Sequence, residues 1–197
     1  MYVVGIVGIT LPLTRPWFVL LTPVHLLLTL GLLFRGLVPI SRQAVYICLL
    51  IYVAGFSIEV LGVQTGFPFG RYSYGSVLGP KLFDTPLIIG INWLLLVLCM
   101  RDLAMRVTSS PVLQSLLGAA LMAGLDVLIE PVAIALGFWH WYGQPVPLQN
   151  YVAWYVCAAV FIAVLHYAWP NPRRNALAPV VFVAQILFFA ILAILHF

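Results

Sequence analysis

The sequence predicts an all-α protein, a polytopic bundle of six or seven transmembrane helices that forms a single integral membrane domain over residues 1–197. Of these residues, 64% are hydrophobic and only 7% are charged, whereas a soluble domain carries about 25% charged residues. The mean hydropathy is +1.12, and the apolar residues are gathered into runs of roughly the length that crosses a bilayer. This composition excludes a water-soluble enzyme, a disordered chain and a protein that binds nucleic acid.

Six apolar runs are candidates for membrane-spanning helices, which take about 20 residues each. In chain order they cover residues 16–34, 44–61, 86–100, 112–129, 151–169 and 176–195. An earlier run at 2–13 is too short to span as a helix that rises about 1.5 Å per residue, so we expect a partial helix packed on the bundle. Membrane strands are not expected, because the runs show no period-two alternation.

The charges in the connecting loops predict the orientation of the bundle. One set of loops holds six arginines: Arg35, Arg42, Arg101, Arg106, Arg173 and Arg174. The other set holds three cations: Arg15, Arg71 and Lys81. The positive-inside rule places the first set in the cytoplasm, so we expect a multi-pass protein of the cytoplasmic membrane. Asp102 lies among arginines of that side and is expected to be a surface charge.

The two longest connections, residues 62–84 and 131–150, fall together on the charge-poor side. The first contains five Gly and two Pro. Irregular backbone is tolerated at membrane depth only where it is buried in protein or lines a wet cavity. Either this segment folds back into the bundle, or it is a plain surface loop.

Two stretches, about 44–100 and 112–169, share landmarks in the same order. In each, a Glu near a helix end is followed seven residues later by a Gly-Phe pair, and a Trp stands seven residues after a Pro. A parallel repeat with its axis along the membrane normal has this form. Such a repeat predicts that Glu59 and Glu130 lie across from each other around one cavity.

Five acidic residues occur in the chain, and four of them fall toward the charge-poor side: Glu59, Asp84, Asp126 and Glu130. Asp126 and Glu130 share one helix face, because residues four apart are neighbours on a helix. An ionised carboxylate at the centre of a bilayer costs about 2.5–3.5 kcal/mol, and this cost falls if the group takes up a proton. A protonated carboxyl in an apolar pocket is a general acid, so we expect these four residues to be catalytic.

Structural alternatives stay open for these carboxyls. Glu59 and Glu130 would instead cap loop amides or pair with the two nearby cations of that side, Arg71 and Lys81. Asp84 also has the form of an ordinary helix start, since a Thr-Pro pair follows it and Pro is favoured in the first turn.

Aromatic residues gather toward the same side: Phe69, Tyr72, Tyr74, Trp93, Trp139, Trp141 and Trp154. Their π faces stabilise a cation, although Trp and Tyr also form interfacial belts in any membrane protein. With these rings we expect Arg71, Asn150 and His140 to contact a substrate, His140 as a proton shuttle. No His pair at i, i+4 and no nucleotide-binding loop occurs, so no metal and no cofactor are expected.

Several of these stretches resemble the membrane carotenoid biosynthesis protein family. They are Glu59-x-x-Gly62-x-x-Thr65-Gly66-x-x-Phe69-Gly70-x-Tyr72-x-Tyr74, Leu78-Gly79-Pro80, Asp126-x-x-x-Glu130-Pro131, Trp139-x-Trp141 and Pro147-x-x-Asn150-x-x-x-Trp154. The best-described members of the family are 1′,2′-hydratases of acyclic carotenoid ends. The resemblance therefore implies a hydro-lyase without a cofactor, acting on an acyclic or monocyclic carotenoid, with water and membrane lipid as its other partners.

This chemistry fits the acidic and aromatic residues. Protonation of a trisubstituted alkene leaves a tertiary cation, which water then captures. Glu130 or Asp126 would donate the proton, and Glu59 would position or activate the water. The indoles of Trp93, Trp139, Trp141 and Trp154 would shape the cation pocket.

Three other functions stay open. A carotenoid cyclase or isomerase begins with the same proton transfer but excludes water. A proton-coupled transporter would use the same acids as a relay. A scaffold would hold other carotenoid pathway enzymes without reacting, and an association with such enzymes is open for the hydratase as well.

Overall fold

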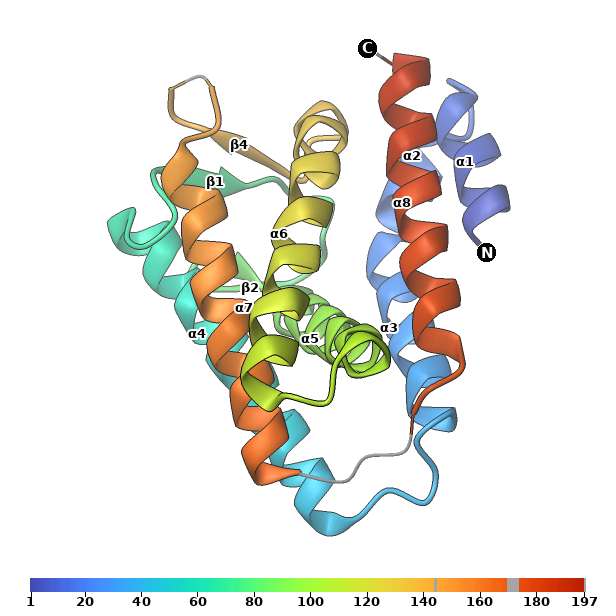
Figure 1. Ribbon diagram of the computed structural model, residues 1–197. Coiled ribbons are helices and arrows are strands. Elements are labelled where there is room, and N and C mark those ends of the chain that lie inside the picture. The colour runs from blue at the N-terminus through green and yellow to red at the C-terminus, as the bar shows by residue number, and fades with distance from the viewer. Residues whose placement is uncertain (144, 170–173, 197) are drawn as a thin grey trace.

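A computed structural model of the protein describes residues 1–143, 145–169 and 174–196, and it confirms the all-α class (Figure 1). Within these ranges the helices are α1 (Tyr2–Thr10), α2 (Arg15–Leu20), α3 (Thr22–Arg35), α4 (Arg42–Thr65), α5 (Ile88–Val107), α6 (Pro111–Ala135), α7 (Leu148–Ala168) and α8 (Leu177–His196). Four short strands join them: β1 (Tyr72–Tyr74), β2 (Lys81–Leu82), β3 (Thr85–Pro86) and β4 (Trp139–Trp141). Arg173, one of the orientation-setting arginines, lies outside the described residues.

Five helices of the described chain, α4 to α8, are long and apolar enough to cross a membrane. With the shorter α3 they correspond to the six predicted runs. The run at 16–34 is not one helix, however, because the helix is interrupted at Leu21, between the end of α2 and the start of α3. Pro23 explains the break, since proline has no backbone N–H and its ring clashes with the carbonyl four residues earlier.

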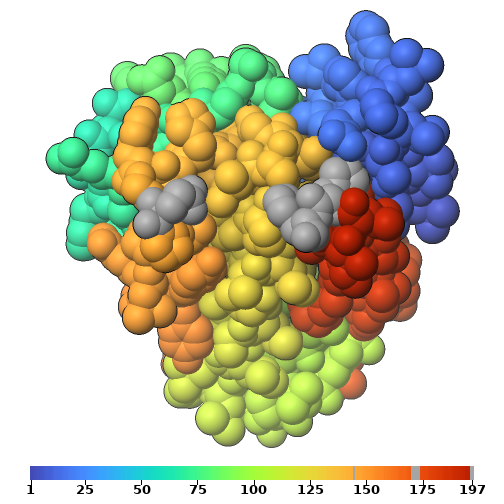
Figure 2. All heavy atoms as spheres, turned by 90° about the horizontal axis from the view of Figure 1, so that it is seen from above, coloured from blue at the N-terminus to red at the C-terminus, as the bar shows by residue number. Residues whose placement is uncertain are grey.

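The partial helix expected at 2–13 is α1, which packs on α2 and α8. Seen from the end that holds the two long loops, the N-terminal segment forms one side of the molecule beside α8 (Figure 2). The helices from α4 to α7 form the other side. The two groups meet across α5, which packs against α3, α4, α6, α7 and α8.

Helix α5 is the central element of the bundle (Figure 1). Fourteen of its 20 residues are buried, because five other helices pack around it. Trp93, near its start, has no exposed surface. Gly55 of α4 makes this packing possible, since a Cβ there would lie 2.5 Å from the Trp93 Cβ atom.

The arginine-rich loops lie at one end of the bundle, as predicted. Arg106 Nη2 donates to the Asn175 carbonyl at 2.8 Å, and Asn175 Nδ2 donates to the Leu33 carbonyl at 2.8 Å. The expectation that Asp102 is a surface charge is wrong. It is only 4% exposed, and its carboxylate accepts from Arg106 Nε at 3.0 Å and from the Asn175 backbone N–H at 2.5 Å.

At the opposite end, the two long loops pair through β1 and β4, which run antiparallel with Tyr72 opposite Trp141 and Tyr74 opposite Trp139. The sequence did not indicate these short strands. The first loop folds back into the protein, since Phe69, Tyr72 and Tyr74 are buried. The second loop begins later than predicted, because α6 continues through Pro131 to Ala135.

Candidate active site

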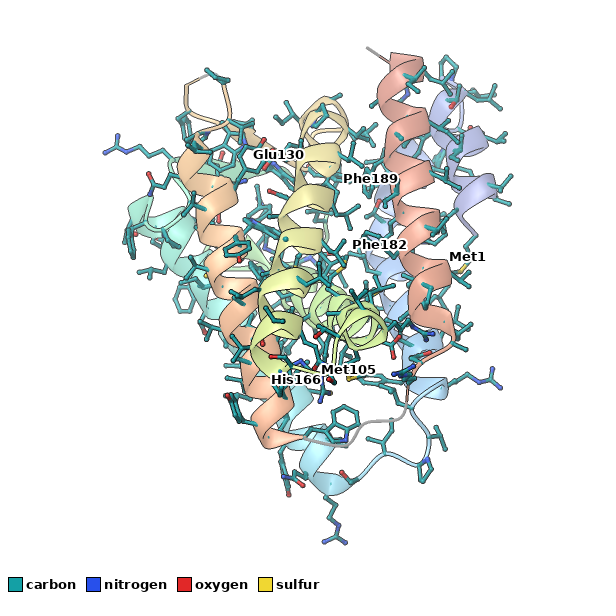
Figure 3. All side chains as sticks on the ribbon, viewed as in Figure 1. Met1, Met105, Glu130, His166, Phe182 and Phe189 are labelled. Carbon is teal, nitrogen blue, oxygen red and sulfur yellow. The ribbon has the colours of Figure 1, made fainter. Side chains whose placement is uncertain are left out.

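A small chamber of about 30 Å³ lies beneath the paired strands β1 and β4. Its walls are formed by Glu59, Phe69, Tyr72, Tyr74, Ile89, Asn92, Asp126, Glu130, Trp139, Trp141, Asn150 and Trp154. Figure 3 shows Glu130 near the end of α6 at this level of the bundle. One water needs about 10–15 Å³ of such space, so the chamber has room for water beside three carboxyl groups.

Glu59 enters the chamber from α4 and is only 2% exposed. Its Oε2 atom accepts hydrogen bonds from the Tyr72 hydroxyl at 2.5 Å and the Tyr74 hydroxyl at 2.7 Å. Its Oε1 atom accepts from Trp93 Nε1 at 2.9 Å. Alternate residues of a strand point to the same side, which is why both tyrosines of β1 reach the same oxygen.

The two phenols stay protonated in this environment. Burial raises the pKa of Tyr72 and of Tyr74 well above its ordinary value of 10.0, and the adjacent Glu59 raises both further. Each hydroxyl therefore donates to Glu59 across the ordinary pH range. Gly62 of α4 leaves room for this contact, because a Cβ there would lie 2.8 Å from the Tyr72 hydroxyl oxygen.

Glu130 enters from α6 and has a matching set of donors. Its Oε2 atom accepts from Trp139 Nε1 at 2.9 Å and Trp141 Nε1 at 3.1 Å, and its Oε1 atom accepts from Asn150 Nδ2 at 3.2 Å. The two indoles belong to β4, again two residues apart on one face. Each glutamate thus accepts three hydrogen bonds, which offset part of the cost of burying a carboxylate.

Asp126 lies one turn before Glu130 on the same face of α6, as predicted, and is 1% exposed. Asn150 Nδ2 donates to its Oδ2 atom at 2.9 Å and so bridges the two acids. No other hydrogen bond to the Asp126 side chain occurs among the described residues. Of the three carboxyls in the chamber, Asp126 is therefore the one with the fewest donors.

Aromatic rings complete the chamber. Trp154 of α7 lines the chamber. It stacks on Trp93 of α5, which is not a lining residue, with the centroids 4.4 Å apart and an interplanar angle of 23°. Tyr72 lies 5.0 Å from Trp141 across the two strands, and Phe69 meets Tyr72 edge-on. The chamber thus combines carboxyl oxygens with π faces, both of which attract positive charge.

Three predicted site residues are not brought to the chamber. Asp84 is exposed at the turn between β2 and β3 with a φ of 59°, and it does not start a helix, because α5 begins at Ile88. Arg71 is exposed. His140 points away from the chamber residues of β4 and lies 2.9 Å from the Ser73 hydroxyl, because neighbouring residues of a strand face opposite sides.

The alternative in which the two glutamates pair with cations is wrong. Within the described part of the chain the salt bridge is Arg106 to Asp102, at the other end of the bundle. Lys81 instead donates to the Tyr74 carbonyl at 2.6 Å. In the same ranges, no group of three or more His, Cys, Asp or Glu side chains is arranged to hold a metal ion.

A second, larger cavity of about 440 Å³ adjoins the acid chamber. Its mostly apolar walls come from α1, α2, α3, α5, α6 and α8, and Figure 3 shows Phe189 between α8 and α6. Ile89, Asn92 and Trp139 line both spaces. The sequence did not indicate this cavity, because its walls combine segments more than 150 residues apart.

Asn92 is a site residue that the sequence reading missed. Its side chain makes no hydrogen bond among the described residues, and it lies where the two spaces meet. The sequence does contain a signal for this residue, because Asn92 is a polar amide next to Trp93 inside an otherwise apolar run.

Comparison with known proteins identifies the family to which the chain belongs. The chain matches the family described as "Carotenoid biosynthesis protein" over residues 21–197. It is 31% identical over 172 residues to bisanhydrobacterioruberin hydratase of Haloarcula japonica, an alignment that covers 79% of this chain and 55% of that protein. The chain thus spans about half the length of this curated relative. No solved structure matches the chain.

Proposed function

The chain belongs to the carotenoid biosynthesis protein family, and from that premise we propose that it hydrates the terminal 1′,2′ double bond of an acyclic or monocyclic carotenoid. One observation carries the proposal. A chamber with three buried carboxyls adjoins an apolar cavity, and Ile89, Asn92 and Trp139 line both spaces. The apolar walls of the cavity fit the end of an isoprenoid chain, and the chamber holds the carboxyl groups and has room for the water that reacts.

Asp126 is the proton donor in this proposal. Within the described part of the chain, Glu59 and Glu130 are each stabilised as carboxylates by three donors, whereas Asp126 accepts one hydrogen bond. Two carboxyls joined through one amide do not ionise together readily, because like charges repel. A proton shared by the pair therefore resides on Asp126, and Glu130 and Asn150 are its positioning residues.

The reaction begins when the π electrons of the alkene take the Asp126 proton. The new C–H bond forms at the less substituted carbon, and the other carbon becomes a tertiary cation. The stacked indoles of Trp93 and Trp154 and the anionic Glu130 stabilise that charge. Because these groups are already in place, little reorganisation accompanies the proton transfer.

Water held by Glu59 then adds to the cation. The new C–O bond forms as the water gives up a proton to Glu59, and this proton returns to Asp126. The sum is one alkene plus one water giving one tertiary alcohol, with every protein group restored. An extended carotenoid is comparable in length to the hydrocarbon core of about 30 Å, so its body stays in lipid while one end reaches the chamber.

Pigment mass analysis in a lycopene-producing bacterium tests the proposal. We expect the wild type to add the mass of one or two waters and a Glu130→Gln variant to add none. Asp84→Asn is the matched control, since it removes a carboxyl of the same side outside the chamber, and it should leave the product unchanged.

The other functions give different results in the same strain. A cyclase or isomerase changes the retention of the pigment without changing its mass. A transporter yields no new compound, and its transport depends on the proton gradient. A scaffold leaves the pigments unchanged when Glu59 is replaced by Gln.

A further inference from the structure

Asn92 lies at the boundary between the acid chamber and the apolar cavity, where the reaction described above gives it no role. Three residues line both spaces, Ile89, Asn92 and Trp139. Ile89 is apolar and lies on the same face of α5 as Asn92, and the Trp139 indole donates to Glu130. The Asn92 amide makes no hydrogen bond among the described residues. It is therefore the boundary residue whose polar group no protein partner occupies in these ranges.

The Asn92 amide is accessible to these spaces. Asn92 keeps part of its surface, and its amide atoms are not among the fully buried, unpartnered polar atoms of the described chain. Because five helices pack around α5, this surface faces the two spaces that Asn92 lines. Amide groups away from bulk water are normally hydrogen-bonded to protein or to ordered water. The partner of Asn92 is therefore a molecule inside the chamber or the cavity.

Glu59 needs a second group to fix the water that reacts. A carboxylate has about four lone-pair sites, and Glu59 already accepts three hydrogen bonds. A water on the remaining site turns about a single bond. At about 10–15 Å³ for each water, the chamber of about 30 Å³ holds roughly two or three, so the waters that contact Glu59 and Asn92 are the same or are neighbours. The amide oxygen of Asn92 can accept the hydrogen that the water does not give to Glu59.

We propose that Asn92 holds the reacting water toward the carotenoid end and thereby determines that the cation is hydrated. The inference rests on the proposed function, which forms the cation at this place. Water adds to the cation when a C–O bond forms and a proton passes from the water to Glu59. Otherwise the cation loses a proton from a neighbouring carbon to a carboxylate, and a C=C bond forms again. A water fixed in position favours the first outcome through proximity and orientation.

Deuterium labelling separates the two outcomes. The full chain in lipid nanodiscs is given lycopene or a monocyclic carotene in D₂O, and the alcohol and the deuterium in the remaining pigment are measured at low conversion. Because carboxyl protons exchange with the solvent, each protonation delivers a deuteron, and a cation that loses a proton instead of adding water leaves a labelled hydrocarbon. Asn92→Leu keeps a side chain of similar size without a hydrogen-bonding atom. We expect its ratio of alcohol to labelled hydrocarbon to fall about tenfold below that of the wild type, as for the loss of one hydrogen bond.

Two further variants show whether the effect comes from hydrogen bonding to water. Asn92→Ser keeps a hydroxyl that donates and accepts, so its ratio should stay closer to that of the wild type than the ratio of Asn92→Leu does. Gln64→Leu is the matched control, because it removes an exposed amide of α4 that lines neither space. It should leave the ratio unchanged.

The inference and the proposed function fail in different ways. If the wild type forms the alcohol and Asn92→Leu keeps the wild-type ratio, the inference is overturned and the proposed function stands. A loss of alcohol and label together in Asn92→Leu overturns it as well, because Asn92 is then needed for folding or for the proton transfer. An Asn92→Ser ratio as low as that of Asn92→Leu has the same consequence. If the wild type forms no alcohol from either carotenoid, the proposed function fails, and the inference fails with it.

Discussion

Glu59, Asp126 and Glu130 are of the same chemical type and lie in one chamber, yet their surroundings differ. Among the described residues, two phenols and one indole donate to Glu59, and two indoles and an amide donate to Glu130. The same amide is the one donor to Asp126 in these ranges. Hydrogen bonds to a charged group are roughly twice as strong as neutral ones. In the proposed mechanism, these differences in donor number assign the roles of acid, positioning partner and water-binding base.

Asp126→Asn should abolish hydration, with a loss of about 10²–10⁴-fold, the usual contribution of a general acid. Asn keeps the size of the side chain and can still accept from Asn150, so the protein should fold. Rates of product formation in membranes, normalised to protein amount, measure the loss. A variant that keeps more than a tenth of the activity contradicts the assignment of Asp126 as the donor.

Alkaline pH should destabilise the protein through Tyr72 and Tyr74. Their pKa values are raised in the folded state, so their contribution to stability is complete below pH 10.0, the ordinary value, and is lost as the pH rises toward the folded values. Tm at pH 9 and pH 11 measures this, and Tyr74→Phe should reduce the difference between the two. An equal difference in wild type and variant would refute the idea.

The strands β1 and β4 are the elements that assemble the site. Each supplies two donors from alternate residues to a glutamate of the preceding helix, and their pairing holds the two glutamates around one chamber. Trp93 and Trp154, which occupy corresponding places in the predicted repeat, stack on each other. The internal repeat stays a prediction, and these contacts are in keeping with it.

Gly62→Ala tests the fit between α4 and the loop that carries β1. The added Cβ would lie 2.7 Å from Phe69 and 2.8 Å from the Tyr72 hydroxyl oxygen, so the loop has to move away from Glu59. We expect activity to fall at least tenfold, while the helix content measured by circular dichroism is kept.

Gly124→Ala is the matched control for this substitution. Gly124 is exposed in the middle of α6, and a Cβ there meets nothing within 4 Å. The change should stabilise the protein by about 1 kcal/mol through helix propensity and leave activity intact. An equal loss of activity in both variants would show that the effect is not specific to the loop.

At the scale of the whole molecule, the two ends of the bundle differ: one is rich in arginine, and the other contains the acid chamber. At the arginine-rich end, Asn175 before α8 donates hydrogen bonds to Asp102 of α5 and Leu33 of α3. The other end carries the chamber and its strands. Between them, α5 is surrounded by helices, and the apolar cavity lies on the side of α1, α3 and α8.

The charge bias predicts that the chamber end faces away from the cytoplasm. Cysteines placed at Lys81 and at Arg42, both exposed, should report this with a membrane-impermeant thiol reagent on intact cells. Lys81→Cys should be labelled and Arg42→Cys protected until the cells are opened. Cys48 and Cys99 are buried, so they should add little background, and labelling in the reverse order would invert the orientation.

The sequence by itself determined the class of protein, the approximate helices, the division of the loops between two ends and the placement of four acidic residues, Glu59, Asp84, Asp126 and Glu130, toward one of those ends. Composition and run length control these features, and both are local properties of the chain. It also indicated the family through motifs that are short and contiguous.

Only the tertiary structure decided which acids share a chamber and which do not. Asp84 and Glu59 are both carboxyls near the same end, but the turn after β2 exposes one and α4 buries the other. The apolar cavity arises from helices at both ends of the chain, so no local pattern encodes it. Contacts between residues far apart in sequence determine burial and pairing, and these in turn determine where a proton can be held.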